Sequence, residues 1–523
     1  MQNTLMHVSL ITADYVNRLG RKDAAQGGAT GEAAFSRVAR RAAGGAFWVL
    51  LAFAAGKLLG FGTNIVLARL LSPAAFGLVS FSMILIGAFL LLQDLGVGPA
   101  LVYSRRDIAV TGGTALTLNV ATAFGLFLLT AVGAAIYSMF GQREMIAGVV
   151  VCLAFGLVIT AAGSVQAALL TKELEFRKKL IPDVAPLAIS GVVSILMALM
   201  GAGVWSLVGG YLAKNLATTL FLWALSPVRP KPSFDWAIAR ELLGYGRHVS
   251  LSAVIGFAVM NVDYFVVGRA LGAGPLGLYT MAFMIGTLPS TLVSQQIATA
   301  IFPAYARLRN APADLLRLFG NSFTISTALS IALGAAVFVG APTIVGPVLG
   351  DKWLGIIEPL RLLAIFGILR AVEFTFSPLY RAIGRPEIMW ISSAIRLVVL
   401  FPLFSLTVTS GIDSVAVVQV IVAALFIPLN GAILAYLLNY RVGALLRLLT
   451  PQLLGVAAIS VIVAACYATP ALVVLISNPF GATLIVGVAI LVHLGIVAAF
   501  SPALVAPLRA YLPRVVGSRF ARR

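Results

Sequence analysis

Charged residues are scarce in this sequence. Asp, Glu, Lys and Arg make up 11% of the 523 residues, whereas a soluble globular protein carries about 25%. Apolar residues make up 60%, and long apolar runs recur from Gly44 almost to the end of the chain. Each run reaches the roughly 18 residues that a helix needs to cross a hydrocarbon layer of about 30 Å. The composition therefore excludes a soluble protein and predicts an all-α polytopic membrane protein.

Residues that carry catalysis or metal binding are also few. The chain has three His and two Cys residues. Cys152 and Cys466 lie far apart in apolar segments, which favours small hydrophobic side chains over a disulfide or a metal pair. For His493, in the last apolar segment, a tolerated polar residue is favoured over a proton-handling role. With no phosphate-binding loop, metal-ligand cluster or nucleophile motif, the sequence predicts no catalytic residue, no metal and no cofactor.

Fourteen apolar segments are long enough to be membrane spans. The longest connection between them, Ser226 to Gly246, has about twenty residues, which is too short for an extramembrane domain. The predicted spans are residues 44–68, 76–100, 114–138, 146–170, 182–202, 204–225, 247–270, 276–300, 319–345, 357–380, 389–409, 413–438, 450–473 and 479–500.

One segment of the chain recurs about 200 residues later. Asn64 to Leu78 reads NIVLARLLSPAAFGL, and Tyr264 to Leu278 reads YFVVGRALGAGPLGL. The two align without a gap, and both have an Arg followed eight residues on by Gly-Leu. Such a period is too long for a solenoid and is typical of a transporter with two homologous halves.

The repeat and the spans together predict an order of parts along the chain. We expect two pseudo-symmetric six-helix bundles, a linker between them and two additional C-terminal helices. The predicted parts are a cytoplasmic N-terminal arm (1–43), a first bundle (44–225), a cytoplasmic linker (226–246), a second bundle (247–438), two further transmembrane helices (450–500) and a basic cytoplasmic tail (501–523).

The distribution of cations predicts the orientation. Twenty-eight of the 37 Lys and Arg residues fall in the two terminal segments and in alternate connections. The remaining connections hold only four, namely Arg69, Arg143, Arg269 and Lys352. By the positive-inside rule this asymmetry predicts that both termini lie in the cytoplasm. The excess of basic charge is therefore attributed to cytoplasmic loops rather than to nucleic-acid binding.

Five cations lie inside predicted spans. Placing such a side chain near the bilayer centre costs roughly 2.5 to 3.5 kcal/mol, so we expect these residues to pair with acids or to line a water-filled cavity. An excess of cations in a cavity is suited to an anionic headgroup. The five are Lys57, Lys214, Arg361, Arg370 and Arg396.

Few acids are available at the same depth. Asp94, Asp263 and Glu373 lie in spans and are candidates for coupling or for charge balance. Arg370 and Glu373 are three residues apart and can touch on one helix face, either as a structural pair or as part of a site. Arg361 is expected to snorkel or to pair with Glu358.

The two lysines have polar rather than acidic neighbours. Lys57 shares a helix face with Asn64, and Lys214 is followed by Asn215. Asn64 and Asn215 are therefore predicted to contribute to a polar cavity lining.

Residues 64–102, NIVLARLLSPAAFGLVSFSMILIGAFLLLQDLGVGPALV, resemble the opening helical hairpin of Wzx-type polysaccharide flippases, which often carries an LARLL-P-FG pattern followed by DLG. Residues 262–282, VDYFVVGRALGAGPLGLYTMA, resemble the corresponding hairpin of the second half. The similarity extends over roughly residues 44–440 and points to the polysaccharide branch of the multidrug/oligosaccharidyl-lipid/polysaccharide exporter superfamily.

This resemblance implies a MATE-like fold and a multi-pass protein of the bacterial inner membrane. It implies a flippase that carries a polyprenyl-diphosphate-linked oligosaccharide between leaflets by alternating access, for lipopolysaccharide or exopolysaccharide biosynthesis. Expected partners are that lipid-linked sugar, membrane lipids, a polysaccharide polymerase and a chain-length regulator, and no nucleic acid. The family offers no catalytic motif to transfer.

Three alternatives remain. A peptidoglycan-precursor flippase needs a basic cavity too. A multidrug or cation antiporter of the same superfamily needs an acidic cleft, which five cations against three acids in the spans disfavour. A membrane polymerase or ligase usually needs a sizeable outward loop, and the outward connections here have at most about a dozen residues.

Overall fold

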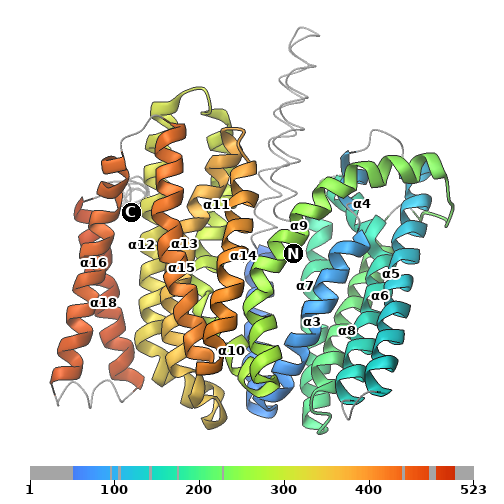
Figure 1. Ribbon diagram of the computed structural model, residues 1–523, viewed down its shortest axis with the longest axis horizontal. Helices are drawn as coiled ribbons and strands as arrows, with labels where there is room; N and C mark the ends of the chain where they lie inside the picture. Colours follow the sequence, from blue (N-terminus) through green and yellow to red (C-terminus); the bar gives the residue numbers. More distant parts are fainter. Residues whose placement is uncertain are drawn as a thin grey trace, which may run out of the picture. The chain divides into compact units, whose positions relative to one another are not determined.

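The structure, a computed structural model, describes residues 51–94, 97–103, 108–139, 144–172, 176–226, 229–438, 442–469 and 479–500. Within these ranges every regular element is helical (Figure 1). The predicted all-α fold is thereby confirmed. The predicted N-terminal arm and C-terminal tail lie outside the described residues.

The helices follow one another with short connections. The first half of the chain contains a helix described over Leu51–Leu70, α3 (Pro73–Asp94), α4 (Val97–Tyr103), α5 (Ile108–Met139), α6 (Glu144–Lys172), α7 (Phe176–Leu199), α8 (Trp205–Leu225) and α9 (Trp236–Leu271). The second half contains α10 (Ala273–Gly286), η1 (Pro289–Ser294), α11 (Gln295–Arg307), α12 (Pro312–Ile344), η2 (Val345–Leu349), η3 (Asp351–Ile356), α13 (Ile357–Ala382), α14 (Glu387–Thr407), η4 (Val408–Ser410), α15 (Ile412–Leu437), α16 (Val442–Ala468) and α18 (Pro479–Phe500).

Each of the fourteen predicted spans falls on a described helix or on a helix pair. By length and composition alone, 11 helices of the described ranges can cross a membrane, or up to 12 if the pair Ala273–Gly286 and Pro289–Arg307, bent by 44°, is one span. The two predicted spans outside that count are α8 and α13. α8 carries the adjacent polar pair Lys214 and Asn215, and α13 carries several charged residues.

The chain divides into two compact units, Met1–Gly277 and Leu278–Arg523. α9 belongs to the first unit because Ile238 and Leu242 pack in the core that α4 and α5 form, and its later part lies against α3. Residues 236–246 of the predicted linker are therefore the beginning of this helix. The assignment of residues 44–225 and 247–438 to two homologous bundles stays a prediction.

The internal repeat has a structural counterpart within the first unit. A Cβ atom added to Gly77 would overlap the carbonyl oxygen of Ala273, and one added to Gly277 would overlap the carbonyl oxygen of Pro73. Pro73 and Ala273, like Gly77 and Gly277, occupy equivalent positions of the repeat. The first turns of α3 and α10 thus contact each other at equivalent positions of the repeat.

Glycine at these contacts is expected to be essential for stability. Gly77→Ala and Gly277→Ala should each lower the free energy of unfolding by roughly 1 to 3 kcal/mol, because the added methyl group meets backbone atoms that cannot rotate away. The measurement is the midpoint of thermal unfolding of the purified protein in detergent. Gly274→Ala is the control, since no atom lies within 4 Å of its added Cβ. Replacement of this helical glycine should leave the midpoint unchanged or raise it. A midpoint raised by Gly77→Ala would contradict the contact.

Polar contacts connect the C-terminal helices to α12 within the second unit. The Nε2 atom of Gln452 on α16 donates to the carbonyl oxygen of Thr324 at 3.3 Å. The Nε2 atom of His493 on α18 lies 3.2 Å from the carbonyl oxygen of Ala328. His493 is fully buried, and these contacts favour the interpretation of this residue as a structural polar group.

Candidate functional site

Lys57 is the candidate cation of the helix Leu51–Leu70. Its side chain is exposed, and its Nζ atom lies 5.6 Å from the ring centre of Phe53. No carboxylate pairs with it among the residues that the structure describes. One turn further on, a Cβ at Gly60 would meet no atom within 4 Å. The helix face that also bears the half-buried Asn64 is therefore open at the level of Lys57.

Lys214 occupies a different environment on α8. It is half-buried, and its Nζ atom lies 5.3 Å from the ring centre of Tyr211, one turn earlier. The next residue, Asn215, is buried. Both Tyr211 and Asn215 pack closely against Gly156 of α6, where a Cβ would overlap them. The close approach of α6 and α8 therefore holds Tyr211 and Asn215 in place. Among the described residues, Lys214 contacts an aromatic ring and pairs with no carboxylate.

In the second unit, Arg396 of α14 forms a two-pronged ion pair with Glu373 of α13. The Nη1 atom of Arg396 donates to Oε2 of Glu373 at 2.9 Å, and Nη2 donates to Oε1. The two side chains are only 18% and 12% exposed. Arg396 also stacks on Phe426 of α15, with 4.6 Å from its guanidinium carbon to the ring centre. Arg396 thus follows the first of the two expectations for cations inside spans, pairing with an acid, and its partner lies on another helix.

The two candidate arginines of α13, Arg361 and Arg370, have mixed outcomes. Arg361 donates to Glu358 at 2.7 Å, which confirms one of the two expectations for it. Arg370 lies against two rings of its own helix, with 5.8 Å to the centre of Phe366 and 5.5 Å to that of Phe374. Glu373, the acid expected to pair with Arg370, is engaged on both oxygens by Arg396. The face of α13 around Arg370 thus combines a cation with aromatic surface.

Two of the predicted acids have local partners in the first unit. Asp94 ends α3 and accepts a hydrogen bond from the backbone N–H of Gly98 at 3.2 Å, so it stabilises the first turn of α4. Asp263 is 1% exposed in α9 and accepts from the backbone N–H of Tyr264 at 2.9 Å. A role for either in coupling stays a prediction.

Sequence reasoning assigned Lys179 to a loop, and the structure places it inside α7. Its side chain is 7% exposed, and Nζ donates to Oγ1 of Thr171 on α6 at 3.2 Å. Asp183 lies one turn further along α7. An acid four residues after a lysine is the usual helical ion-pair spacing, so the sequence did contain a signal that α7 begins before residue 182.

The helical fold, the repeat and the cations within the helices define a polytopic membrane protein of the transporter class. The chain belongs to the polysaccharide biosynthesis protein family, which matches it over residues 66–358. This finding confirms the resemblance noted from the two hairpins.

Individual relatives agree with the family. The chain is 25% identical over 378 residues to the teichuronic acid biosynthesis protein TuaB of Bacillus subtilis (strain 168), which covers 71% of this chain and 78% of the relative. It is 24% identical over 398 residues to the lipopolysaccharide biosynthesis protein WzxC of Escherichia coli (strain K12), covering 75% of this chain and 79% of the relative.

Two solved structures illustrate the fold of this chain. The lipid II flippase MurJ in its inward closed conformation superposes with a TM-score of 0.67 at 14% identity, over 88% of this chain and 98% of MurJ. An inward-facing multidrug resistance transporter of the MATE family gives a TM-score of 0.57 at 18% identity, over 73% of this chain and 95% of the transporter. The expected MATE-like fold is confirmed.

Proposed function

We propose that this protein is a flippase that moves a polyprenyl-diphosphate-linked oligosaccharide across the bacterial cytoplasmic membrane for the assembly of a surface polysaccharide. The observation that carries the proposal is the family match over residues 66–358. Relatives named for lipopolysaccharide, teichuronic acid and succinoglycan biosynthesis or transport support the same class of cargo. The protein is proposed to act as a transporter and not as an enzyme.

The chemistry of the cargo explains the cations at membrane depth. A diphosphate and a hydrophilic sugar must cross a layer in which bare charge is strongly disfavoured, while the prenyl chain is soluble in lipid. Lys57, Lys214 and Arg370 have aromatic neighbours, with 5.3 to 5.8 Å from the charged group to the ring centre. In our proposal Lys57 and Lys214 of the first unit bind the diphosphate, and polar residues such as Asn64 solvate the sugar. Arg370 of the second unit is proposed as a separate contact to the cargo.

Arg396 and Arg361 have a different part in this proposal. The two-pronged pair with Glu373 neutralises Arg396 and occupies both oxygens of its partner, whereas the pair of Arg361 with the exposed Glu358 is weak. Arg396 therefore positions α13 against α14, and the Glu373 carboxylate is the charge-balancing group. Alternating access follows from the rearrangement of such helix contacts when cargo binds.

The proposed setting follows from the charge distribution. Both termini lie in the cytoplasm by the positive-inside rule, and the cargo is taken up from the inner leaflet. A polysaccharide polymerase and a chain-length regulator are proposed to act on the delivered repeat units.

A peptidoglycan-precursor flippase is the second candidate. The fold likeness to MurJ favours it, but a likeness at 14% identity concerns the fold alone, and the family match points to polysaccharide. An antiporter of cationic drugs is disfavoured because Lys57 and Lys214 would repel such a substrate.

A deletion strain tests the proposal. Loss of this gene should abolish the surface polysaccharide, and polyprenyl-diphosphate oligosaccharide should accumulate in a form that an external glycosidase cannot reach. Lipid extraction and mass spectrometry of treated and untreated cells measure both quantities. Accumulation of peptidoglycan precursor with normal polysaccharide would support the second candidate and overturn the first.

A further inference from the structure

A cavity of about 700 Å³ lies at one end of the second unit, away from the candidate cations inside the helices. It forms where the connection from α11 to α12, the connection from α13 to α14 and the last residues of α15 meet. Its wall includes Arg309, Asn310, Pro312, Gly384, Arg385 and Leu438.

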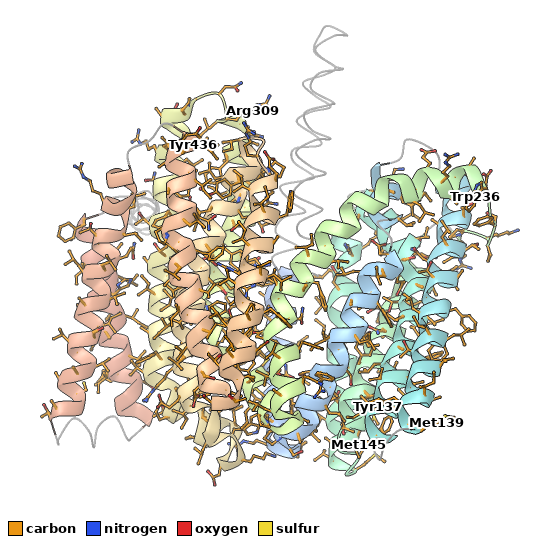
Figure 2. The ribbon with its side chains drawn as sticks, viewed as in Figure 1. Tyr137, Met139, Met145, Trp236, Arg309 and Tyr436 are labelled. Carbon is orange, nitrogen blue, oxygen red and sulfur yellow. The ribbon has the colours of Figure 1, made fainter. Side chains whose placement is uncertain are left out.

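The polar side of this cavity is cationic. Arg309 is exposed (Figure 2), and Arg385 keeps 61% of its side chain exposed despite an ion pair with Glu387 at 3.3 Å. Glu387 and Asp314, one turn into α12, are nearby acids, but neither contributes to the wall. An exposed ion pair of this kind is worth little and exchanges readily for another anion. The guanidinium of each arginine can offer a phosphate group two parallel hydrogen bonds.

The backbone on one side of the cavity is held in place. Gly384 has a φ of 79°, in the left-handed region, and the N–H of Arg385 donates to the carbonyl oxygen of Tyr380 at 2.9 Å. This arrangement ends α13 with a glycine cap that satisfies its last carbonyl groups. The position of Arg385 is therefore fixed by a rigid turn rather than by a loose loop.

The depth of the cavity relative to a membrane is indicated by its neighbours. Tyr436, near the end of α15, is 85% exposed, and Figure 2 shows it at the same end of the second unit as Arg309. Exposed tyrosines of membrane proteins gather at the headgroup level. Another part of the cavity wall is apolar and consists of Ile383, Leu437 and Leu438. The cavity therefore has an apolar side next to its cationic side.

We propose that this cavity binds the phosphate headgroup of an acidic phospholipid, with Arg309 and Arg385 on the phosphate and the leucines against the glycerol and the first acyl carbons. Basic pockets between transmembrane helices are known to suit such headgroups. The positive-inside rule assigns this arginine-lined cavity to the cytoplasmic leaflet, and only that assignment rests on the topology given under the proposed function.

Binding of phosphatidylglycerol to the purified full-length protein tests this proposal. Native mass spectrometry in a zwitterionic detergent, with titrated lipid, gives the apparent affinity. Arg309→Gln/Arg385→Gln should weaken phosphatidylglycerol binding by about 10- to 30-fold, as expected for the loss of two surface cations. The matched control is Arg229→Gln/Arg240→Gln, two exposed arginines of the first unit. This change should alter the affinity by less than about 3-fold, because neither residue lines the cavity.

The titration is repeated with phosphatidylcholine, inorganic diphosphate and a polyprenyl diphosphate. Weak binding of the first two, with tight phosphatidylglycerol binding that depends on Arg309 and Arg385, supports the proposal. Equal losses in both double variants would show general surface attraction and overturn it. Binding of polyprenyl diphosphate but not phosphatidylglycerol would make the cavity a cargo site and also overturn it. Because no transport is measured, failure of the proposed function leaves this result unaffected.

Discussion

Replacement of Arg396 by Ala is expected to lower the free energy of unfolding by about 3 kcal/mol, because it leaves the Glu373 carboxylate enclosed without its partner. Both oxygens of Glu373 accept hydrogen bonds from Arg396, and only 12% of its side chain is exposed. Loss of the stacking on Phe426 adds to the effect. Thermal unfolding in detergent and the amount of protein in the membrane fraction measure the loss, and export should fall with it.

Two further variants separate the effect of losing the ion pair from the effect of losing side-chain volume. Arg396→Ala/Glu373→Ala should recover part of the stability, since no charge is stranded. Arg361→Ala removes a pair whose acid is 65% exposed, so it should cost less than about 1 kcal/mol. A double variant that is less stable than Arg396→Ala by the full cost of Glu373→Ala would show that the two side chains do not interact.

Lys57→Ala and Lys214→Ala are each expected to reduce export by roughly 10-fold or more, with protein abundance close to that of the wild type. The physical reason is the loss of one charge-assisted contact to the cargo diphosphate, which is worth about 1.5 to 3 kcal/mol. Neither lysine has a carboxylate partner in the described parts of the chain, so neither change strands a buried charge. The measurement is surface polysaccharide per unit of membrane-inserted protein.

Charge-conserving variants provide the control for this prediction. Lys57→Arg and Lys214→Arg should retain most of the export, whereas Lys57→Gln and Lys214→Gln should resemble the alanine variants. Lys352→Ala, on η3, changes a lysine outside the spans and should have little effect. If all alanine variants export normally without accumulation of the lipid-linked intermediate, the role of these cations in cargo binding is wrong.

The helices could be predicted because a single physical constraint determines them. Every backbone polar group in a bilayer must be satisfied within its own helix, so long apolar runs indicate helices, and all fourteen predicted spans fall on helices. Their ends were less predictable, because hydropathy measures the apolar part of a helix and not its length. α9 begins at Trp236, where the Asp235 side chain accepts from the N–H groups of Ala237 and Ile238. That cap was a signal present in the sequence.

Contacts within one helix turn could be predicted, and contacts between helices could not. The pair Arg361–Glu358 follows from a spacing of three residues. The pair Arg396–Glu373 spans 23 residues and depends on how α13 and α14 pack. A contact between Glu373 and Arg370 was expected from the same spacing of three residues, whereas both oxygens of Glu373 accept from Arg396. The reciprocal contact of Gly77 and Gly277 is an intermediate case, since the repeat identified both glycines but not their closeness.

Translocation in reconstituted liposomes tests the central claim most directly. The purified protein is incorporated with a fluorescent polyprenyl-diphosphate oligosaccharide, and the fraction accessible to an external quencher or glycosidase is followed over time. We predict protein-dependent movement of this lipid, slowed about 10-fold or more by Lys214→Ala through the lost contact to the diphosphate, and no movement of labelled phosphatidylcholine. A rate equal to that of empty liposomes, or equal movement of phosphatidylcholine, would contradict the account.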